Sequence, residues 1–301
     1  MSHDANELAL LALAARPRFS WARTRTRIDD LGSPLEVLRA EYSDQLIDDG
    51  LDAELAAAAE RSTSLETEGI GVTTVWGADY PRQLRTVHDA PPVLYWKGHF
   101  SDVDEYGVAV VGTRQPDLWG QQFARALGRH LAEAGVPVVS GLARGIDGEA
   151  MRGSLEAAGR TVGVIGTGVR KYYPAEHRAL QDAVSEHLLI SQFSPDASPS
   201  RQSFPMRNVV MSGFASMTVV VQAGETSGTR IQANAAVRHG RPLVITERVV
   251  ERAEWARDLC TSGYDVSVVG TPSDALEAVE RIHNRRRNAA ERWGLGTLLT
   301  A

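Results

Sequence analysis

Glycines accompanied by basic or hydroxyl side chains recur where apolar, β-branched runs of the sequence end. Four such runs lead into loops that read GTRQPDLWG, SGLARGID, GTGVRKYYP and QAGETSGTR. Glycine lets a backbone approach a ligand closely, free amides at a helix start carry partial positive charge, and arginine binds phosphate through two hydrogen bonds at once. One such loop alone is more often a plain turn, but four of them at one edge predict a site for an anion.

The residues of these loops that are predicted to meet the anion are glycines that shape the backbone, basic side chains and hydroxyls. They are Gly112, Arg114, Gly141, Arg144, Gly168, Lys171, Ser227, Gly228 and Thr229. Asp147 follows Arg144 closely, and its place favours the N-cap of a helix that begins near Gly148 over a catalytic carboxylate. No catalytic residue is therefore assigned.

A further segment, SPSRQSFPMRNVVMSGF, is interpreted as a loop stiffened by prolines. Phe204 stands there beside Arg207 and Asn208, shortly after Arg201. Basic residues around an exposed aromatic ring suit a single-stranded nucleic acid, because charge follows the backbone and a ring stacked on a base contributes about 1–3 kcal/mol. The alternative, that Phe204 fills the core between two helices, is equally open.

The elements that must position these loops are strands alternating with helices. Apolar runs occur at 108–111, 137–139, 162–165, 188–191, 218–221, 242–245 and 266–269, and two further strands are expected within 69–76 and 93–96. Amphipathic segments of helical length lie between most of them. This alternation predicts an α/β fold with a doubly wound parallel sheet, helices on both faces and right-handed connections. Ligands of such sheets bind beyond the carboxyl ends of the strands, where the four loops lie.

The chain divides into three predicted parts. Residues 1–67 predict a small N-terminal helical domain, residues 68–280 the α/β domain, and residues 281–301 a basic helical tail. Within the first part, Ser33 and Pro34 stand in the order expected for an N-cap and a first helical residue. The arginines of the tail are better explained as a solvated helix face than as additional nucleic-acid contacts.

Composition narrows the class of protein. The 301 residues carry a net charge of −6, are 43% hydrophobic and include one cysteine, Cys260. This excludes an intrachain disulfide and a cysteine-rich zinc site. Without a signal peptide or an apolar run of membrane length, we expect a cytoplasmic protein that does not enter a membrane. The glycine pattern of dinucleotide-binding folds and the P-loop pattern are absent, so no cofactor and no metal are expected.

Several of these motifs occur together, and in the same order, in one family. VAVVGTR, VVSGLARGID, GTGVRKYYP, FPMRN and SGTRIQANAAVRHGRPL, preceded by GIGVTTVWGADYPRQL and DAPPVLYWKG, resemble the DNA-processing protein A family, also called Smf, over about residues 69–245. The resemblance implies an extended Rossmann fold that binds single-stranded DNA without sequence preference, usually as a homodimer. It also implies protection of DNA and help in loading a RecA-type recombinase during natural transformation or recombination, and no catalytic reaction.

The resemblance also assigns roles to matching positions. As DNA contacts it implies Arg114, Arg144, Lys171, Arg207 and Asn208, and as the stacking residue Phe204. As residues that shape the phosphate-facing loops it implies Gly112, Gly141, Gly168, Ser227 and Gly228.

The chain departs from the family at several places, and two other functions stay open. Met151 stands where the family commonly has histidine, Val209 where it commonly has arginine, and no winged-helix domain is recognised after the core. The alternatives are a nucleoside-monophosphate phosphoribohydrolase, or a sensor that binds a small nucleotide on the same loops. The hydrolase is disfavoured because no acid follows the SGT tripeptide within 231–236, while Glu225 precedes it.

Overall fold

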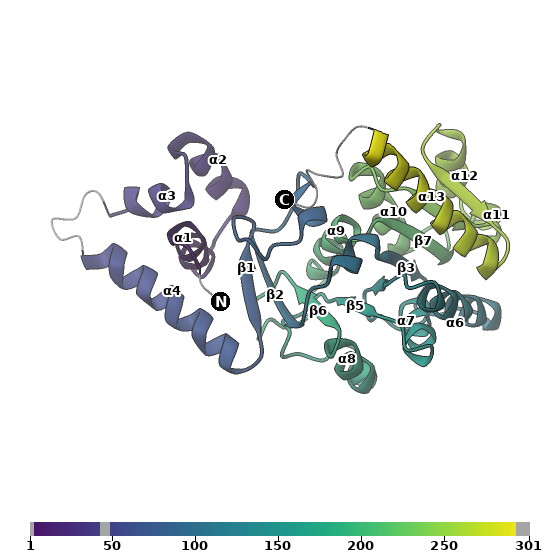
Figure 1. The fold of residues 1–301 in the computed structure, drawn as a ribbon, viewed down its shortest axis with the longest axis horizontal. Coiled ribbons are helices and arrows are strands. Elements are labelled where there is room, and N and C mark those ends of the chain that lie inside the picture. The colour runs from purple at the N-terminus through teal and green to yellow at the C-terminus, as the bar shows by residue number, and fades with distance from the viewer. Residues whose placement is uncertain (1–2, 43–48, 293–301) are drawn as a thin grey trace.

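The computed structural model describes residues 3–42 and 49–292, which fold into a helical module beside a larger α/β unit (Figure 1). The described helices of the module are α1 (Ala5–Ala14), α2 (Trp21–Leu31), α3 (Pro34–Ala40) and α4 (Asp49–Thr67). Ser33 caps α3 as predicted, because its hydroxyl oxygen accepts a hydrogen bond from the Glu36 amide. Helix α2 was not predicted, since its sequence is polar and only Ile28 of it is buried.

A nine-stranded sheet runs through the α/β unit in the order β1-β2-β6-β5-β4-β3-β7-β8-β9. Its strands are β1 (Gly71–Thr74), β2 (Val93–Gly98), β3 (Val108–Gly112), β4 (Val138–Ser140), β5 (Thr161–Val164), β6 (Leu188–Ser191), β7 (Met217–Gln222), β8 (Leu243–Thr246) and β9 (Val266–Val269). The pairs β1–β2 and β2–β6 are antiparallel, and the pairs from β6 through to β9 are parallel. The predicted doubly wound α/β fold with N-terminal helices is confirmed.

The direction in which strands are added reverses between β3 and β7, which lie side by side in the middle of the sheet. From β3 the chain proceeds through β4 and β5 to β6, and from β7 it proceeds the opposite way through β8 to β9. The connections that leave β3 and β7 therefore diverge and open a crevice at the carboxyl ends of these strands, where doubly wound folds bind their ligands.

Helices cover both faces of the sheet. One core lies under α6 (Leu118–Glu133), α7 (Ile146–Glu156), α8 (Arg178–Ser185) and α13 (Pro272–Arg292), and the other under α5 (Arg82–Arg85), α9 (Ser203–Phe214), α10 (Gly228–Arg238), α11 (Glu247–Arg252) and α12 (Glu254–Thr261). Along β3, Val108 and Val110 belong to the first core, and Ala109 and Val111 to the second. Because successive side chains of a strand point to opposite faces, a strand buried on both reads as a continuous apolar run.

The helical module shares a third core with the edge of the sheet. Val72 of β1 and Val93 of β2 pack with Leu11 and Leu38 of the module. At the other end of the chain, α13 passes through position 281 without a break, so the segment predicted as a basic tail starts inside a helix. There the Arg286 Nη1 donates to the Ser216 carbonyl at 2.9 Å, and residues 293–301 lie outside the described part.

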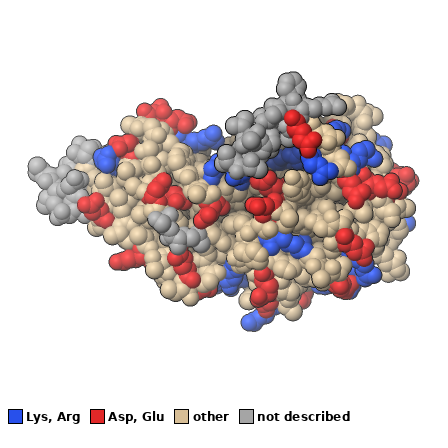
Figure 2. All heavy atoms as spheres, in the orientation of Figure 1, with Lys and Arg blue, Asp and Glu red and all other residues tan. Residues whose placement is uncertain are grey.

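Charges on the face seen in Figure 2 are mixed, with acidic and basic side chains interspersed and no continuous basic field. This agrees with the net charge of −6. Attraction of an anion therefore has to come from a local site and not from the overall field of the protein. Across the described ranges, no helix is both long enough and apolar enough for a membrane span.

Two glycines let α6 and α7 pack closely, and this contact can be tested. A Cβ at Gly128 would overlap the carbonyl oxygen of Ala150, and one at Gly153 the carbonyl oxygen of Arg125. We expect Gly128→Ala to lower the thermal unfolding midpoint by about 2–6 °C, because the clash with backbone outweighs the better helix propensity of alanine. The control is Gly224→Ala, where nothing lies within 4 Å of the added methyl. Equal midpoints for the two variants would contradict the close packing.

Candidate nucleic-acid interface

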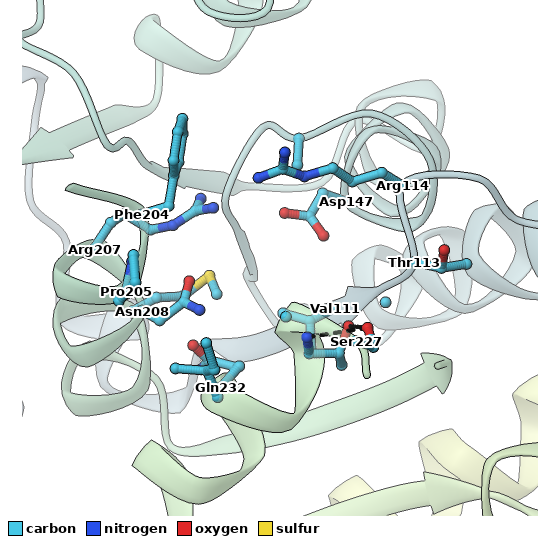
Figure 3. A pocket seen from close by; sticks show the side chains of 16 residues that line it. Val111, Thr113, Arg114, Asp147, Phe204, Pro205, Arg207, Asn208, Ser227 and Gln232 are labelled. Carbon is cyan, nitrogen blue, oxygen red and sulfur yellow. Dashed lines mark hydrogen bonds between the residues drawn. The ribbon is translucent and has the colours of Figure 1, made fainter. Parts of the chain in front are cut away.

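A cavity of about 440 Å³ opens in the crevice between the ends of β3 and β7. Its walls are the loop after β3, the loop after β4 with the first turn of α7, the start of α9 and the N-terminus of α10. Three of the four predicted loops and the FPMRN segment thus meet at one place. The side chains that surround it in Figure 3 include Arg114, Asp147, Phe204, Arg207, Asn208, Ser227 and Gln232.

One wall of this cavity is the N-terminus of α10. Ser227 caps the helix, because its oxygen accepts a hydrogen bond from the Thr229 amide at 3.2 Å while its hydroxyl donates to Thr229 Oγ1 at 2.9 Å. Gly228 is exposed, and no atom lies within 4 Å of the point where a side chain would begin. A ligand can therefore approach the first turn, where unpaired amides and the helix dipole favour an anion such as phosphate.

Gln232 lies one turn further along α10 and lines the same cavity (Figure 3). Gln232 is 1% exposed, and among the described residues neither its amide nitrogen nor its amide oxygen has a hydrogen-bond partner. A buried polar group without a partner costs about 1–3 kcal/mol, so such groups are normally satisfied. The amide lies beneath the wall of the cavity in this conformation, and a change of its side-chain rotamer would bring it into contact with a ligand or water there.

Arg207 places a buried charge against the same cavity. It is 5% exposed, its Nη1 donates to the Val164 carbonyl at 2.9 Å, and its Nε has no partner. The guanidinium lies so close to Gly141 that any side chain at that position would overlap it. Burial lowers the pKa of Arg207 and the charge of Asp147 opposes this effect. Gly141, predicted as a loop glycine that lets phosphate approach, is therefore required to make room for Arg207.

Asp147 holds the loop after β4 in shape. Helix α7 begins at Ile146 with Gly145 as its N-cap residue, so the prediction that Asp147 caps the helix is wrong. The helix starts earlier because Gly145 adopts a φ of 77°, which turns the chain before Asp147 is reached. The buried Asp147 Oδ2 accepts a hydrogen bond from the Gly141 amide at 3.1 Å, and burial raises the pKa of this carboxyl against the opposing charge of Arg207.

The FPMRN motif begins a helix, whereas the sequence analysis had placed it in a loop. Helix α9 starts at Ser203, so Pro205 lies in the first turn, where a proline needs no hydrogen-bond donor. Residues three and four apart share one face of a helix. Phe204, Arg207 and Asn208 therefore reach the cavity together.

Phe204 separates this cavity from a second one of about 660 Å³. The guanidinium carbon of Arg114 is 5.2 Å from the centre of the Phe204 ring, and the ring of Tyr173 is 5.4 Å from it. The ring is only partly buried and borders both cavities, so it does not fill the core. Because Arg114 and Arg207 also line both, the two cavities adjoin at Phe204, and we refer to the pair as the groove.

Other predicted residues lie at the margin of this groove or away from it. Arg144 borders the second cavity, is exposed and forms an ion pair with Glu176. Lys171 is exposed and lines neither cavity. The Gly168 amide donates to the Ala197 carbonyl at 2.9 Å, and the neighbouring backbone leaves no room for a side chain. Gly168 therefore serves packing.

The glycine at the end of β3 also serves packing. Although Gly112 lines the first cavity, a Cβ there would meet the side chain of Ile146 and the carbonyl of Gln222. Sequence reasoning missed two residues of the groove, Gln232 and Tyr173. A signal existed for Gln232, since it lies one helical turn after the SGT tripeptide. The sequence around Tyr173 contained no signal that its ring would lie beside Phe204.

The family model and the curated relatives agree on one family. The family model for DNA recombination-mediator protein A matches residues 71–279. DNA processing protein DprA of Bacillus subtilis (strain 168) is 38% identical over 178 residues, which are 58% of this chain and 60% of the relative. Protein Smf of Escherichia coli (strain K12) is 35% identical over 166 residues, or 54% of this chain and 44% of the relative. The chain thus spans about half the length of the curated relatives it matches.

Solved structures show the same fold. The X-ray structure of DprA from Streptococcus pneumoniae has a TM-score of 0.70 at 24% identity, covering 92% of this chain and 98% of that one. A structure that describes the single-stranded DNA binding mode of DprA from Helicobacter pylori has a TM-score of 0.61 at 23% identity, covering 70% and 96%. Since the matching family model spans the chain from β1 into α13, more than half of its length, this chain belongs to the DNA recombination-mediator protein A (DprA/Smf) family.

Proposed function

We propose that this chain binds single-stranded DNA without sequence preference in the groove that passes Phe204, and that it acts by binding and not by catalysis. One observation carries the proposal: the α10 N-terminus, the Arg114 guanidinium and the Phe204 ring line two adjoining cavities, with Arg114 and Phe204 bordering both. Amides and guanidinium groups bind backbone phosphates, and a ring stacks on a base of any identity. Family membership supports this ligand, as does the single-stranded DNA binding described for the Helicobacter pylori relative.

The dimensions of the groove favour a strand over a single nucleotide. Its two parts measure about 440 and 660 Å³ and meet at Phe204. A bound strand would place consecutive nucleotides on either side of the ring. A duplex keeps its bases stacked inside and offers none of them to Phe204, so the groove suits unpaired DNA.

The carboxylates around the groove support a binding role over hydrolysis. Of the described residues, Asp147 is the only acid lining the first cavity, and the Gly141 amide and the charge of Arg207 already engage it. In the second cavity Glu176 is paired with Arg144. A phosphoribohydrolase needs an acid or base that is free to exchange a proton with its substrate. A small-nucleotide sensor is the alternative that uses the first cavity alone.

We further propose that a homodimer of the chain works in the cytoplasm, protects the bound strand and passes it to a RecA-type recombinase. The recombination-mediator description of the family supports this role. Assembly of a RecA filament on single-stranded DNA coated with a single-strand-binding protein tests it. We expect assembly to be faster with the chain than without it, and an unchanged rate would refute this step.

Salt dependence tests the contact between Arg114 and phosphate. We expect Arg114→Ala to weaken binding about tenfold for oligothymidine and mixed sequences alike. The slope of log affinity against log salt should become less steep by about 0.7, because one phosphate contact fewer releases fewer counterions. Fluorescence anisotropy at several salt concentrations measures both quantities.

The matched control for this experiment is Arg129→Ala. Arg129 lies in the C-terminal half of α6 and is exposed, and its polar contact within the described part of the chain is with Glu156, at 3.4 Å. Its loss changes the net charge equally, so both the affinity and the salt slope should stay close to wild type. Equal losses in the two variants would show that general charge, and not the groove, binds DNA.

Gln232 allows a second test in which stability and binding change in opposite directions. Gln232→Met removes the unpaired amide at similar volume, so we expect the free energy of unfolding without ligand to rise by about 1 kcal/mol. DNA affinity should fall about five- to tenfold if the amide meets the strand. The exposed Gln122→Met, in helix α6, serves as control, with both quantities unchanged. Lower stability together with unchanged affinity would contradict our assignment of Gln232.

A further inference from the structure

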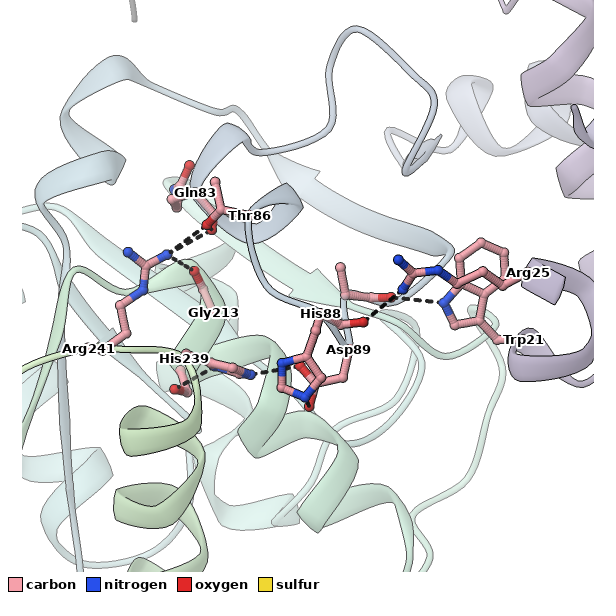
Figure 4. Close-up of polar contacts among 11 residues, drawn as sticks. Trp21, Arg25, Gln83, Thr86, His88, Asp89, Gly213, His239 and Arg241 are labelled. Carbon is pink, nitrogen blue, oxygen red and sulfur yellow. Dashed lines mark hydrogen bonds and ion pairs between the residues drawn. The ribbon is translucent and has the colours of Figure 1, made fainter. Parts of the chain in front are cut away.

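A cluster of two histidines and one aspartate lies away from the groove, at the junction of the helical module and the α/β unit (Figure 4). His88 and Asp89 belong to the segment between α5 and β2, and His239 is the C-cap residue of α10. Asp89 and His239 are 150 residues apart in sequence, so no local motif joins them. This separation explains why the sequence led us to expect no metal.

The three side chains present their donor atoms to one another. His239 Nε2 is 2.7 Å from Asp89 Oδ1, and His88 Nε2 is 3.7 Å from Asp89 Oδ2. One ligand atom from each residue lies within 4.8 Å of the others, and the centres of the His88 and His239 rings are 5.8 Å apart. The His239 side chain is fully buried, whereas that of His88 is 64% exposed. His88 is therefore free to move toward a shared ligand while His239 stays fixed.

We propose that His88, Asp89 and His239 bind a divalent transition-metal ion, with Zn²⁺ the best match. Two imidazole nitrogens and a carboxylate oxygen are donors that Zn²⁺ accepts at about 2.0–2.2 Å, which places neighbouring donors about 3.3 Å apart in a tetrahedron. A rotation of the exposed His88 side chain brings its nitrogen to that separation. The fourth position is left to water, as in other zinc sites with three protein ligands.

The surroundings of His239 prepare it as a ligand. Its Nδ1 is 3.0 Å from the Ser212 hydroxyl oxygen, a contact that fixes the plane of the ring. Without metal, the hydroxyl donates to Nδ1 and Nε2–H donates to Asp89. With metal on Nε2, the single proton of the neutral ring sits on Nδ1 and is donated to Ser212, the outer-shell bond that orients metal-bound histidines.

An ion at this place would join three parts of the chain. The Arg25 Nη1 donates to the His88 carbonyl at 2.8 Å, and the Trp21 Nε1 to the Ala90 carbonyl at 3.2 Å, so helix α2 is already attached to this segment. His239 ends α10, the helix whose other end lines the groove. The metal would therefore link the segment between α5 and β2 directly to α10. Through the hydrogen bonds of Trp21 and Arg25 to that segment it would also stabilise the junction with the helical module, independently of whether the groove binds DNA.

The test uses the full chain without an affinity tag, stripped of metal with a chelator that is then removed. We expect one equivalent of Zn²⁺ to bind by calorimetry and to raise the unfolding midpoint by about 5 °C at a hundredfold excess over the dissociation constant. Co²⁺ in place of Zn²⁺ should give the visible absorption of a site with low coordination number. Absence of a stoichiometric site in either titration would overturn the proposal.

Variants test whether the ion binds at these residues. His88→Ala removes an exposed ligand, so the metal-free midpoint should match wild type while the Zn²⁺-induced shift and the Co²⁺ absorption disappear. His99→Ala, which removes another exposed histidine outside the cluster, should keep both. His239→Gln keeps a polar side chain and should also abolish the shift. Metal binding that survives in His88→Ala, or that is lost in His99→Ala, would assign the ion elsewhere and refute the site.

Discussion

Arg207 carries a full positive charge at a position that is only 5% exposed, and much of the crevice is arranged around it. The absence of a side chain at Gly141 gives the guanidinium its space, the Val164 carbonyl accepts one of its hydrogen bonds, and Asp147 opposes its charge. A buried charge that loses its partners costs several kcal/mol, so these residues depend on one another. The GLARGID and FPMRN motifs, far apart in sequence, are thereby coupled through a single group.

The burial of Arg207 also determines what α9 presents to the groove. Because Arg207 is anchored, Phe204 one turn before it is held at the boundary between the two cavities, within reach of Arg114 and Tyr173. A ring held in this way loses little conformational freedom when a ligand stacks on it. The family resemblance implied that Arg207 itself contacts the ligand, whereas its geometry suits a residue that positions Phe204 and contributes charge from beneath the surface.

The layout of the fold could be predicted from the sequence because every strand of the sheet's centre is buried on both faces and reads as an apolar run. The same pattern predicted the edge of the sheet at which the candidate site lies, because the loops follow the carboxyl ends of parallel strands. The strand order then shows that the loops after β3 and β7 are neighbours. Helix α2 could not be found in this way, because its sequence, WARTRTRIDDL, is polar overall and buries only Ile28. Its stability comes from contacts that only the folded chain makes.

The roles of individual groove residues were harder to predict. A glycine after a strand has the same appearance whether it makes room for a phosphate or for a guanidinium, so Gly141 was assigned to the ligand and Gly168 likewise. Asp147 resembled an N-cap because the early turn at Gly145 depends on backbone conformation and not on a recognisable pattern. An isolated glutamine in a helix is usually solvated, so its residue type alone did not single out Gln232. Its burial without a hydrogen-bond partner is visible only in the structure.

β2, β1 and the helical module lie beyond β6, which would otherwise be an open edge of the sheet. β1 and β2 add two antiparallel strands beside β6, and the module packs on them through Val72 and Val93. An uncovered edge strand offers a row of unpaired amides and carbonyls to other chains. A fragment that began at β3 would expose β6 in this way and would tend to polymerise strand upon strand. The first third of the sequence, although distant from the crevice, thus protects the edge of β6 and prevents the molecule from associating with other copies along its sheet.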